Sequence, residues 1–192
     1  MTSQWEEFKE KIQNLSLELG KFEIKFLDRY GFKEFCDSLN ANVCGFREIC
    51  ATGYFSETSM KEFEKILSYM RSISCGKVRL ICPELNPTDK RDTKNLQALK
   101  KIVDAGAEIR VNNRLHARFL VAYSKSANSV LSGGLLVLGS FDFNKDCIGL
   151  ERHDAGITTR HPDLVKSAID FFEQIWNEEQ SENLLEKYKA HI

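Results

Sequence analysis

The sequence predicts an α/β protein with a mixed, mostly parallel sheet that is flanked by helices on both faces. The first observation is that residues 46–112 alternate short apolar runs with amphipathic stretches. This β-α-β-α-β order is typical of parallel strands joined by helices. The second observation is that three further strand-like runs follow without long helices between them. The third is a C-terminal amphipathic stretch that can cover one face of the sheet.

The individual elements follow from local patterns taken in chain order. A buried strand is predicted from residue 46 to Gly53. A helix over 56–73 follows, because its apolar residues recur three or four positions apart. The remaining predictions are strands over 77–85, 108–112, 116–124, 135–141 and 152–159, helices over 92–107 and 162–188, and a hairpin loop over 124–134.

Residues 1–45 are predicted to be a helical accessory segment, separate from a main domain over residues 46–192. Apolar side chains from Trp5 to Leu19 recur at steps of three and four, which is typical of one face of an amphipathic helix. Residues 32–39 predict a second, short helix. The stretch between them, residues 21–27, fits either a strand or a helix.

The composition excludes several classes of function. The formal net charge is −1, so a polyanion would have to be bound by a local basic patch. None of the six cysteines forms a CxxC pair, so neither a zinc site nor a disulfide framework is predicted, and a reducing, cytoplasmic location is expected. The N-terminal residues lack the apolar core of a signal peptide, and no apolar run is long enough to span a membrane.

Polar and apolar residues alternate around His116. Arginine, asparagine and histidine occupy the even positions from Arg110 to Arg118, whereas most odd positions from 111 to 121 are apolar. On one continuous strand the two series would lie on opposite faces. A turn near Asn112 and Asn113 would break that alternation. Taken alone, His116 fits a structural histidine at the start of a strand.

The order of these elements, with the stretches LHARFLVA, LVLGSFDFN and ERHDAGITT, resembles the phospholipase D-like superfamily in its short, single-motif form. The similarity runs from about Phe46 to Trp176. The family's signature is HxKxxxxD, then GSxN, then an acidic residue downstream. At these positions the chain has His116, Arg118 in place of lysine, Tyr123 in place of aspartate, Gly139 and Ser140, Asp142 in place of asparagine with Asn144 close by, and Asp154.

The resemblance implies that two histidines cleave a phosphodiester bond in two steps. One imidazole attacks phosphorus and forms a phosphohistidine, while the other protonates the leaving oxygen and later activates water. Because one chain carries one such motif, a complete site implies a homodimer in which two His116 side chains face each other across a two-fold axis. The scheme requires no metal and no cofactor.

The resemblance also implies roles for the residues around the phosphate. Arg118 would supply a permanent charge and a planar fork of donors, and Ser140 would donate its hydroxyl. Asp154 would orient the ring of His116 by accepting its second N–H. The further substrate-binding candidates are Arg114, Asp142 and Asn144.

Two functions are predicted from these residues. The first is a metal-independent phosphodiesterase, in particular a nuclease, that acts as a homodimer. The alternative is a catalytically weakened module that binds phosphate or nucleic acid or serves as a dimerisation scaffold, because the lysine, aspartate and asparagine of the signature are replaced. A lipid substrate is disfavoured, since the sequence shows neither a signal peptide nor a membrane-seeking helix.

Overall fold

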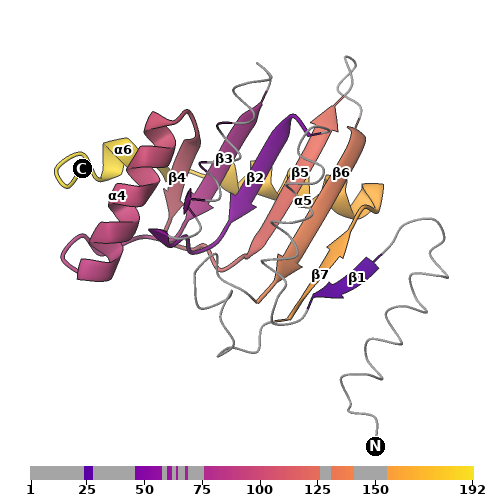
Figure 1. Cartoon of the computed structure of the whole chain (residues 1–192), viewed down its shortest axis with the longest axis horizontal. Helices are drawn as coiled ribbons and strands as arrows, with labels where there is room; N and C mark the ends of the chain where they lie inside the picture. Colours follow the sequence, from indigo (N-terminus) through magenta and orange to yellow (C-terminus); the bar gives the residue numbers. More distant parts are fainter. Residues whose placement is uncertain are drawn as a thin grey trace, which may run out of the picture.

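In the computed structural model, the described residues are 24–27, 46–57, 60–61, 64, 68, 76–125, 131–140 and 155–192. Their strands form one eight-stranded sheet with the order β1-β7-β6-β5-β2-β3-β4-β8 (Figure 1). The strands are β1 (Ile24–Leu27), β2 (Glu48–Thr52), β3 (Lys77–Cys82), β4 (Glu108–Asn112), β5 (Phe119–Lys125), β6 (Leu131–Gly139), β7 (Gly156–Thr159) and β8 (Ser181–Asn183). The helices with described bounds are α4 (Lys90–Asp104), α5 (Pro162–Trp176) and α6 (Leu184–Lys187).

The sheet is mixed, as predicted, but it is not mostly parallel. Only the pairs β2–β3 and β3–β4 are parallel, and the other neighbouring strands pair antiparallel. The reason lies in the connections, because a parallel pair needs a crossover of a dozen or more residues. Helix α4 supplies such a crossover between β3 and β4, whereas only residues 113–118 join β4 to β5 and only residues 126–130 join β5 to β6.

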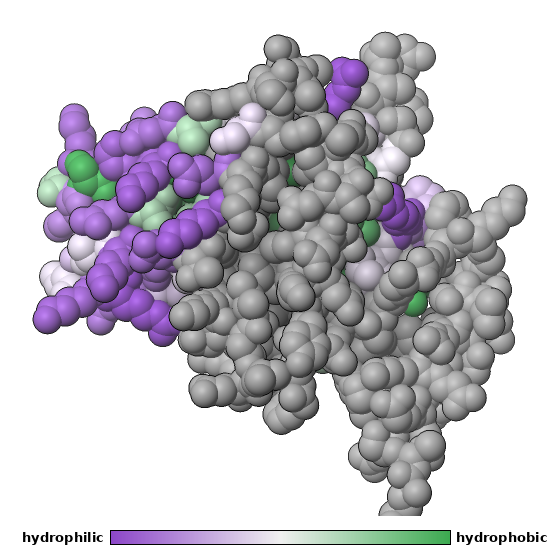
Figure 2. All heavy atoms as spheres, in the orientation of Figure 1, coloured by the Kyte–Doolittle hydropathy of each residue, from purple (hydrophilic) through white to green (hydrophobic). Residues whose placement is uncertain are grey.

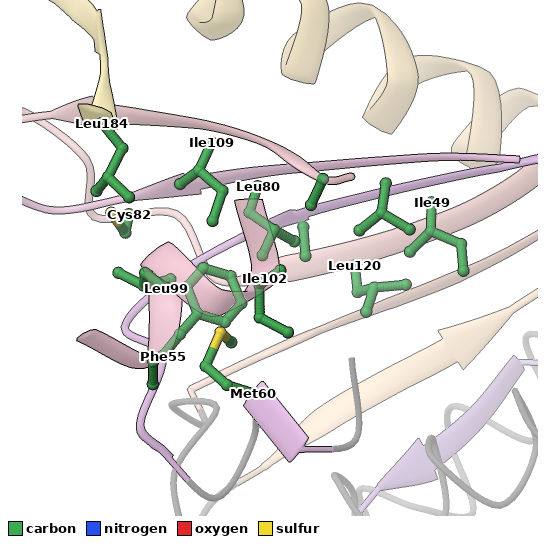
Figure 3. Close-up of a cluster of buried hydrophobic side chains, with 14 of the residues drawn as sticks. Ile49, Phe55, Met60, Leu80, Cys82, Leu99, Ile102, Ile109, Leu120 and Leu184 are labelled. Atoms are coloured by element: carbon green, nitrogen blue, oxygen red, sulfur yellow. The ribbon is translucent and has the colours of Figure 1, made fainter. Parts of the chain in front are cut away.

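Helices cover both faces of the sheet, as predicted (Figure 1). Helix α4 lies in front of the sheet in that view and α5 lies behind it. Figure 3 shows Leu99 and Ile102 of α4 facing Leu80 and Ile109 of the strands. We call this the α4-side cluster, and its other members include Ile49, Phe55, Met60, Val111 and Leu120.

The opposite face packs against α5. We call this the α5-side cluster, and it consists of Cys50, Ile81, Leu115, Phe119, Val121, Tyr123, Leu136, Val165, Ile169, Phe172, Ile175 and Trp176. Helix α4 begins at Lys90, before the predicted start at residue 92, and α5 begins at Pro162 as predicted. The Asp89 side chain accepts hydrogen bonds from the first turn of α4, and Pro162 occupies the first turn of α5. The outer surface of α4 is mainly hydrophilic (Figure 2).

The C-terminal segment was expected to be one helix over residues 162–188, and this expectation is wrong. Helix α5 ends at Trp176, where its apolar stripe ends, and β8 then pairs antiparallel with β4. A short helix, α6, follows, and its first turn donates two backbone N–H groups to the Asn183 side chain. The charged stretch after Trp176 thus adds an edge strand to the sheet instead of extending the helix.

The predicted helix with its apolar face from Trp5 to Leu19 and the short helix over 32–39 lie outside the described residues. In the stretch where strand and helix were both open, Ile24–Leu27 forms β1, which pairs antiparallel with β7. Of the described positions of the predicted 56–73 helix, Ser56 is not helical, whereas residues 57, 60, 61, 64 and 68 are. Within the described part of the chain, no helix is long and apolar enough to cross a membrane.

Strand β6 begins at Leu131, within the stretch predicted to be a loop, and this places Gly134 beneath α5. A Cβ atom at Gly134 would overlap Cγ1 of the buried Val165, whereas a Cβ at Gly133 would meet no atom within 4 Å. We therefore expect Gly134→Ala to lower the free energy of unfolding by about 1–2 kcal/mol through overpacking. Gly133→Ala is the matched control, with an expected change below about 0.5 kcal/mol. Equal urea-unfolding midpoints for the two variants would contradict the close approach of α5 to β6.

Candidate functional site

The segment with Arg114, His116 and Arg118 runs across the ends of the central strands of the sheet. Residues 113–118 connect β4 to β5, and in the strand order β2 and β3 lie between those two strands. The connection therefore crosses the carboxyl ends of the parallel strands β2 and β3. In open α/β sheets, ligands bind in the crevice outside these strand ends. We call this margin the carboxyl edge.

A buried asparagine fixes the start of this connection. The Asn112 side-chain oxygen accepts a hydrogen bond from the Arg114 backbone N–H (2.9 Å), and the Leu115 N–H donates to the Asn112 carbonyl (3.2 Å). The Asn112 amide donates to Glu178 (3.0 Å) and to Ser181 (2.9 Å), which anchors the turn to the segment after α5. The turn at residues 113–114 is thus held in place by the hydrogen bonds of Asn112.

This turn breaks the alternation that the sequence shows. Before it, Val111 packs in the α4-side cluster, whereas after it Leu115 packs in the α5-side cluster. Arg110 and Asn112 consequently reach α5 and the residues after it, since Arg110 donates to the Trp176 carbonyl and its guanidinium lies 4.8 Å from the Trp176 ring centroid. The even positions from 110 to 118 therefore do not share one face.

From Leu115 onward the alternation holds. Leu115, Ala117 and Phe119 pack towards α5. His116 and Arg118 lie between them in the chain and are both exposed. Because successive side chains of an extended segment point to opposite sides, His116 and Arg118 project together from the side away from α5. The structure thus brings these two candidate residues side by side at the carboxyl edge, and Arg114 is exposed on the same connection.

Ser140 lies next to this pair, at the end of β6. The Arg118 guanidinium donates to the Ser140 carbonyl (3.3 Å), and the Gly139 N–H donates to the Arg118 carbonyl (3.2 Å). The Ser140 N–H donates to Ala155 O (2.9 Å), and the Ser140 hydroxyl accepts from Ala155 N (3.1 Å). The structure therefore joins Arg118 and Ser140. The other candidates, Asp142, Asn144 and Asp154, lie outside the described residues.

Tyr123 lies on the opposite face from His116 and Arg118. Its ring is fully buried in the α5-side cluster, and its hydroxyl donates to Glu48 (2.7 Å) and accepts from Arg79 (3.3 Å). Burial, followed by the nearby Cys50 and Glu48, raises the pKa of the Tyr123 hydroxyl far above its usual value. The residue in the aspartate position of the signature is thus part of the packing under α5.

Thr52 also reaches the carboxyl edge, and it is not among the residues that the sequence predicts for the site. Its hydroxyl bonds the backbone on both sides of Arg118. The signal in the sequence is a hydroxyl residue that follows the apolar run Ile49–Ala51 and stands directly before Gly53. This signal is too common to identify the residue, because the partner backbone lies 65 residues away in the chain.

No group of three or more metal-ligating side chains occurs among the described residues. The thiols Cys50 and Cys82 are buried inside the two clusters. Burial raises the pKa of each thiol to about 12, so both stay protonated at neutral pH. Among the described residues, the groups at the carboxyl edge that can bind an anion are therefore cations and hydrogen-bond donors.

In the central part of the sheet, a His-x-Arg segment leads into strand β5 and a Gly-Ser pair stands at the end of its neighbour β6. Comparison with solved structures shows that this is a phospholipase D-like fold. The phospholipase D family member Nuc from Salmonella typhimurium matches with a TM-score of 0.61 and 15% identity over 85% of this chain and 98% of its own. NucT from Helicobacter pylori matches with a TM-score of 0.61 and 14% identity over 85% of this chain and 99% of its own.

A third similar structure is polyphosphate kinase from Porphyromonas gingivalis, with a TM-score of 0.63 and 18% identity over 81% of this chain and 26% of the kinase. No model of a known protein family matches the sequence, and no curated protein sequence matches it at a significant level. The chain therefore has the fold that its motifs predict, and this similarity is detected in the three-dimensional structure.

Proposed function

We propose that this protein is a metal-independent phosphodiesterase that acts on nucleic acid as a homodimer, with one His116 from each subunit. The observation that carries the proposal is the joint exposure of His116 and Arg118 on one side of the strand entry, beside Ser140. The names of the Salmonella and Helicobacter proteins, one of them assigned to the phospholipase D family, support this choice of chemistry.

The chemistry needs one nucleophile and one proton donor. The His116 imidazole of one subunit would attack phosphorus, and the bond from phosphorus to the leaving oxygen would break as the second imidazole protonates that oxygen. That second imidazole would then take a proton from water, which displaces the histidine from phosphorus. Arg118 would hold the phosphate oxygens through its planar fork, with Ser140 as a hydroxyl donor and Asp154 as the residue that orients the ring.

The position of Tyr123 favours activity over the weakened module. The replacement of aspartate by tyrosine in the signature raised the question of whether the site still turns over. Tyr123 is buried beneath α5 and bonds Glu48 and Arg79, on the face away from His116. This replacement therefore removes no group from the exposed side of the carboxyl edge, and Arg118 keeps the positive charge of the lysine that it replaces.

The test is turnover by purified protein in excess EDTA. Single-stranded DNA, double-stranded DNA, RNA and bis(p-nitrophenyl) phosphate serve as substrates, and sedimentation gives the oligomeric state. We expect cleavage of at least one nucleic acid at a rate that EDTA leaves within about twofold, by a dimer. Cleavage that EDTA abolishes would contradict the histidine mechanism. Salt-dependent DNA binding without turnover, weakened by Arg118→Ala, would support the binding module instead.

A further inference from the structure

Thr52 is the last residue of β2 and is fully buried, with an exposed fraction of 0%. Its hydroxyl makes two hydrogen bonds to β5 and the residues before it. The Thr52 Oγ1 donates to the Ala117 carbonyl (3.0 Å), and the Phe119 N–H donates to Thr52 Oγ1 (3.3 Å). One side chain thus holds the two peptide groups that flank Arg118.

The backbone of β2 cannot make these contacts itself. The register of β2 and β5 ends with the pair of Thr52 and Phe119. The next residue, Gly53, has a positive φ of 148° and donates its N–H to Ile81 of β3 (3.1 Å). The β2 backbone therefore turns away from β5 at Thr52, next to the segment that carries His116 and Arg118. On that flank the Thr52 hydroxyl supplies the hydrogen bonds that the backbone of β2 no longer makes.

The other flank of the same segment is held by β6. The Gly139 N–H donates to the Arg118 carbonyl (3.2 Å), next to Ser140. Ala117, Arg118 and Phe119 are thereby tied to both neighbouring strands. Their side chains alternate, so the backbone directions set at Ala117 and Phe119 fix where Arg118 and the adjacent His116 project.

From this geometry we infer that Thr52 is a positioning residue for the reaction proposed above: its hydroxyl orients the backbone that carries His116 and Arg118. The inference rests on the proposed function. Thr52 touches neither the substrate nor the reacting atoms, because it is buried and its hydroxyl bonds the backbone. Reacting groups must be held within roughly 0.5 Å and 10–20° of the productive geometry, and a displacement of about 1 Å can cost up to about 10²-fold in rate.

The test compares Thr52→Val with Thr52→Ser. Valine matches threonine in shape but leaves the Ala117 carbonyl and the Phe119 N–H without the hydroxyl, whereas serine keeps both bonds. We expect Thr52→Val to lower kcat about tenfold with KM changed less than about threefold, and Thr52→Ser to stay within about threefold of wild type. If Thr52→Val does not fold, Thr52→Ala removes the same hydroxyl and takes its place.

Thr159→Val is the matched control. Thr159 is also buried, at 1% exposure, and its hydroxyl also accepts a backbone hydrogen bond, from the His161 N–H (3.1 Å). It lies at the end of β7 away from Gly156, which pairs with Gly139. We expect Thr159→Val to reduce thermal stability as well but to leave kcat unchanged, because no bond of the segment around Arg118 is lost.

Two outcomes would overturn the inference while leaving the proposed function standing. In the first, the wild-type protein turns over substrate and Thr52→Val has the same kcat. In the second, Thr52→Val has a lower kcat, but Thr159→Val lowers kcat by the same factor. If the wild-type protein shows no turnover, the proposed function fails instead. The ring resonances of His116 in NMR spectra then test the positioning directly. We expect these resonances to differ from wild type in Thr52→Val and to match wild type in Thr52→Ser. Resonances of Thr52→Val that match wild type would overturn the inference.

Discussion

Replacing His116 with glutamine is expected to lower kcat for phosphodiester cleavage by at least about 10³-fold. Glutamine has a similar size and can hydrogen-bond, but it can neither form a phosphohistidine nor exchange a proton near neutral pH. Because His116 is exposed at the carboxyl edge, its replacement should leave the free energy of unfolding within about 0.5 kcal/mol. Single-turnover rates and urea unfolding of the same preparation check both statements.

His191→Gln provides the control for this change, since His191 is also exposed and lies at the C-terminal end, outside the candidate site. It should keep full activity. Residual activity of His116→Gln above about one tenth of wild type would rule out His116 as nucleophile.

Heterodimers with one intact His116 separate the two-subunit scheme from a site within one chain. If each reaction uses both imidazoles, the heterodimer should be as inactive as the variant homodimer. If each chain holds its own complete site, the heterodimer should retain about half of the wild-type rate. Co-expression with two different affinity tags isolates the mixed species for this measurement.

Replacing Arg79 with alanine is expected to give the largest loss of stability, about 2–3 kcal/mol. Arg79 projects from β3 under α5, where it binds both oxygens of Glu173 (3.0 and 2.5 Å) and lies 3.5 Å from Glu48. Its guanidinium lies 5.2 Å from the Phe172 ring centroid and 5.4 Å from that of Trp176. Removal of the cation leaves two carboxylates close together and takes away its contacts with both rings.

The partial exposure of this network sets the size of the expected effect. The Arg79 side chain is only 12% exposed, but those of Glu48 and Glu173 are 27% and 37% exposed, so water screens part of the lost interaction. The expected loss therefore lies below the 3–5 kcal/mol that is typical of breaking a fully buried pair.

Lys166→Ala is the contrast on the same helix. The Lys166–Asp170 pair is also close, at 2.5 Å, but both side chains are more than 60% exposed. Its loss should change the free energy of unfolding by less than about 0.5 kcal/mol. Urea unfolding at equal ionic strength measures both variants. A loss for Arg79→Ala no larger than that for Lys166→Ala would show that the Arg79 network does not stabilise the packing of α5.

Local pattern accounts for the parts of the fold that could be predicted. The amphipathic pattern of the C-terminal stretch predicts the helix α5 that covers one face of the sheet, and alternation around His116 indicates the strand that carries Val121. These features depend on residues a few positions apart in the chain. The directions of the strands depend instead on which segments become neighbours, so the mostly parallel sheet was a wrong prediction. The residues after Trp176 were also predicted wrongly, because only the exposed edge of β4 makes β8 a strand.

Some features of the candidate site could likewise be predicted from local sequence, and others depend on the tertiary structure. The spacing of His116 and Arg118, with an order of motifs that resembles a known family, predicts that both belong to one site. The structure places both side chains, exposed, at the carboxyl edge, and their roles there stay predictions. Asp142, Asn144 and Asp154 stay predictions. Only the tertiary structure showed that the turn at residues 113–114 separates Arg110 and Asn112 from this pair, and that Tyr123 belongs to the packing under α5.

The sequence by itself determined which chemistry this chain can offer, since an imidazole next to a guanidinium on an extended segment is a local property. The tertiary structure decided what surrounds and holds that segment. Thr52 bonds residues 65 and 67 positions away, and the Gly139 N–H, at the end of β6, bonds the Arg118 carbonyl just before β5 begins. Such contacts are absent from any short stretch of sequence, because the folding of the whole sheet creates them.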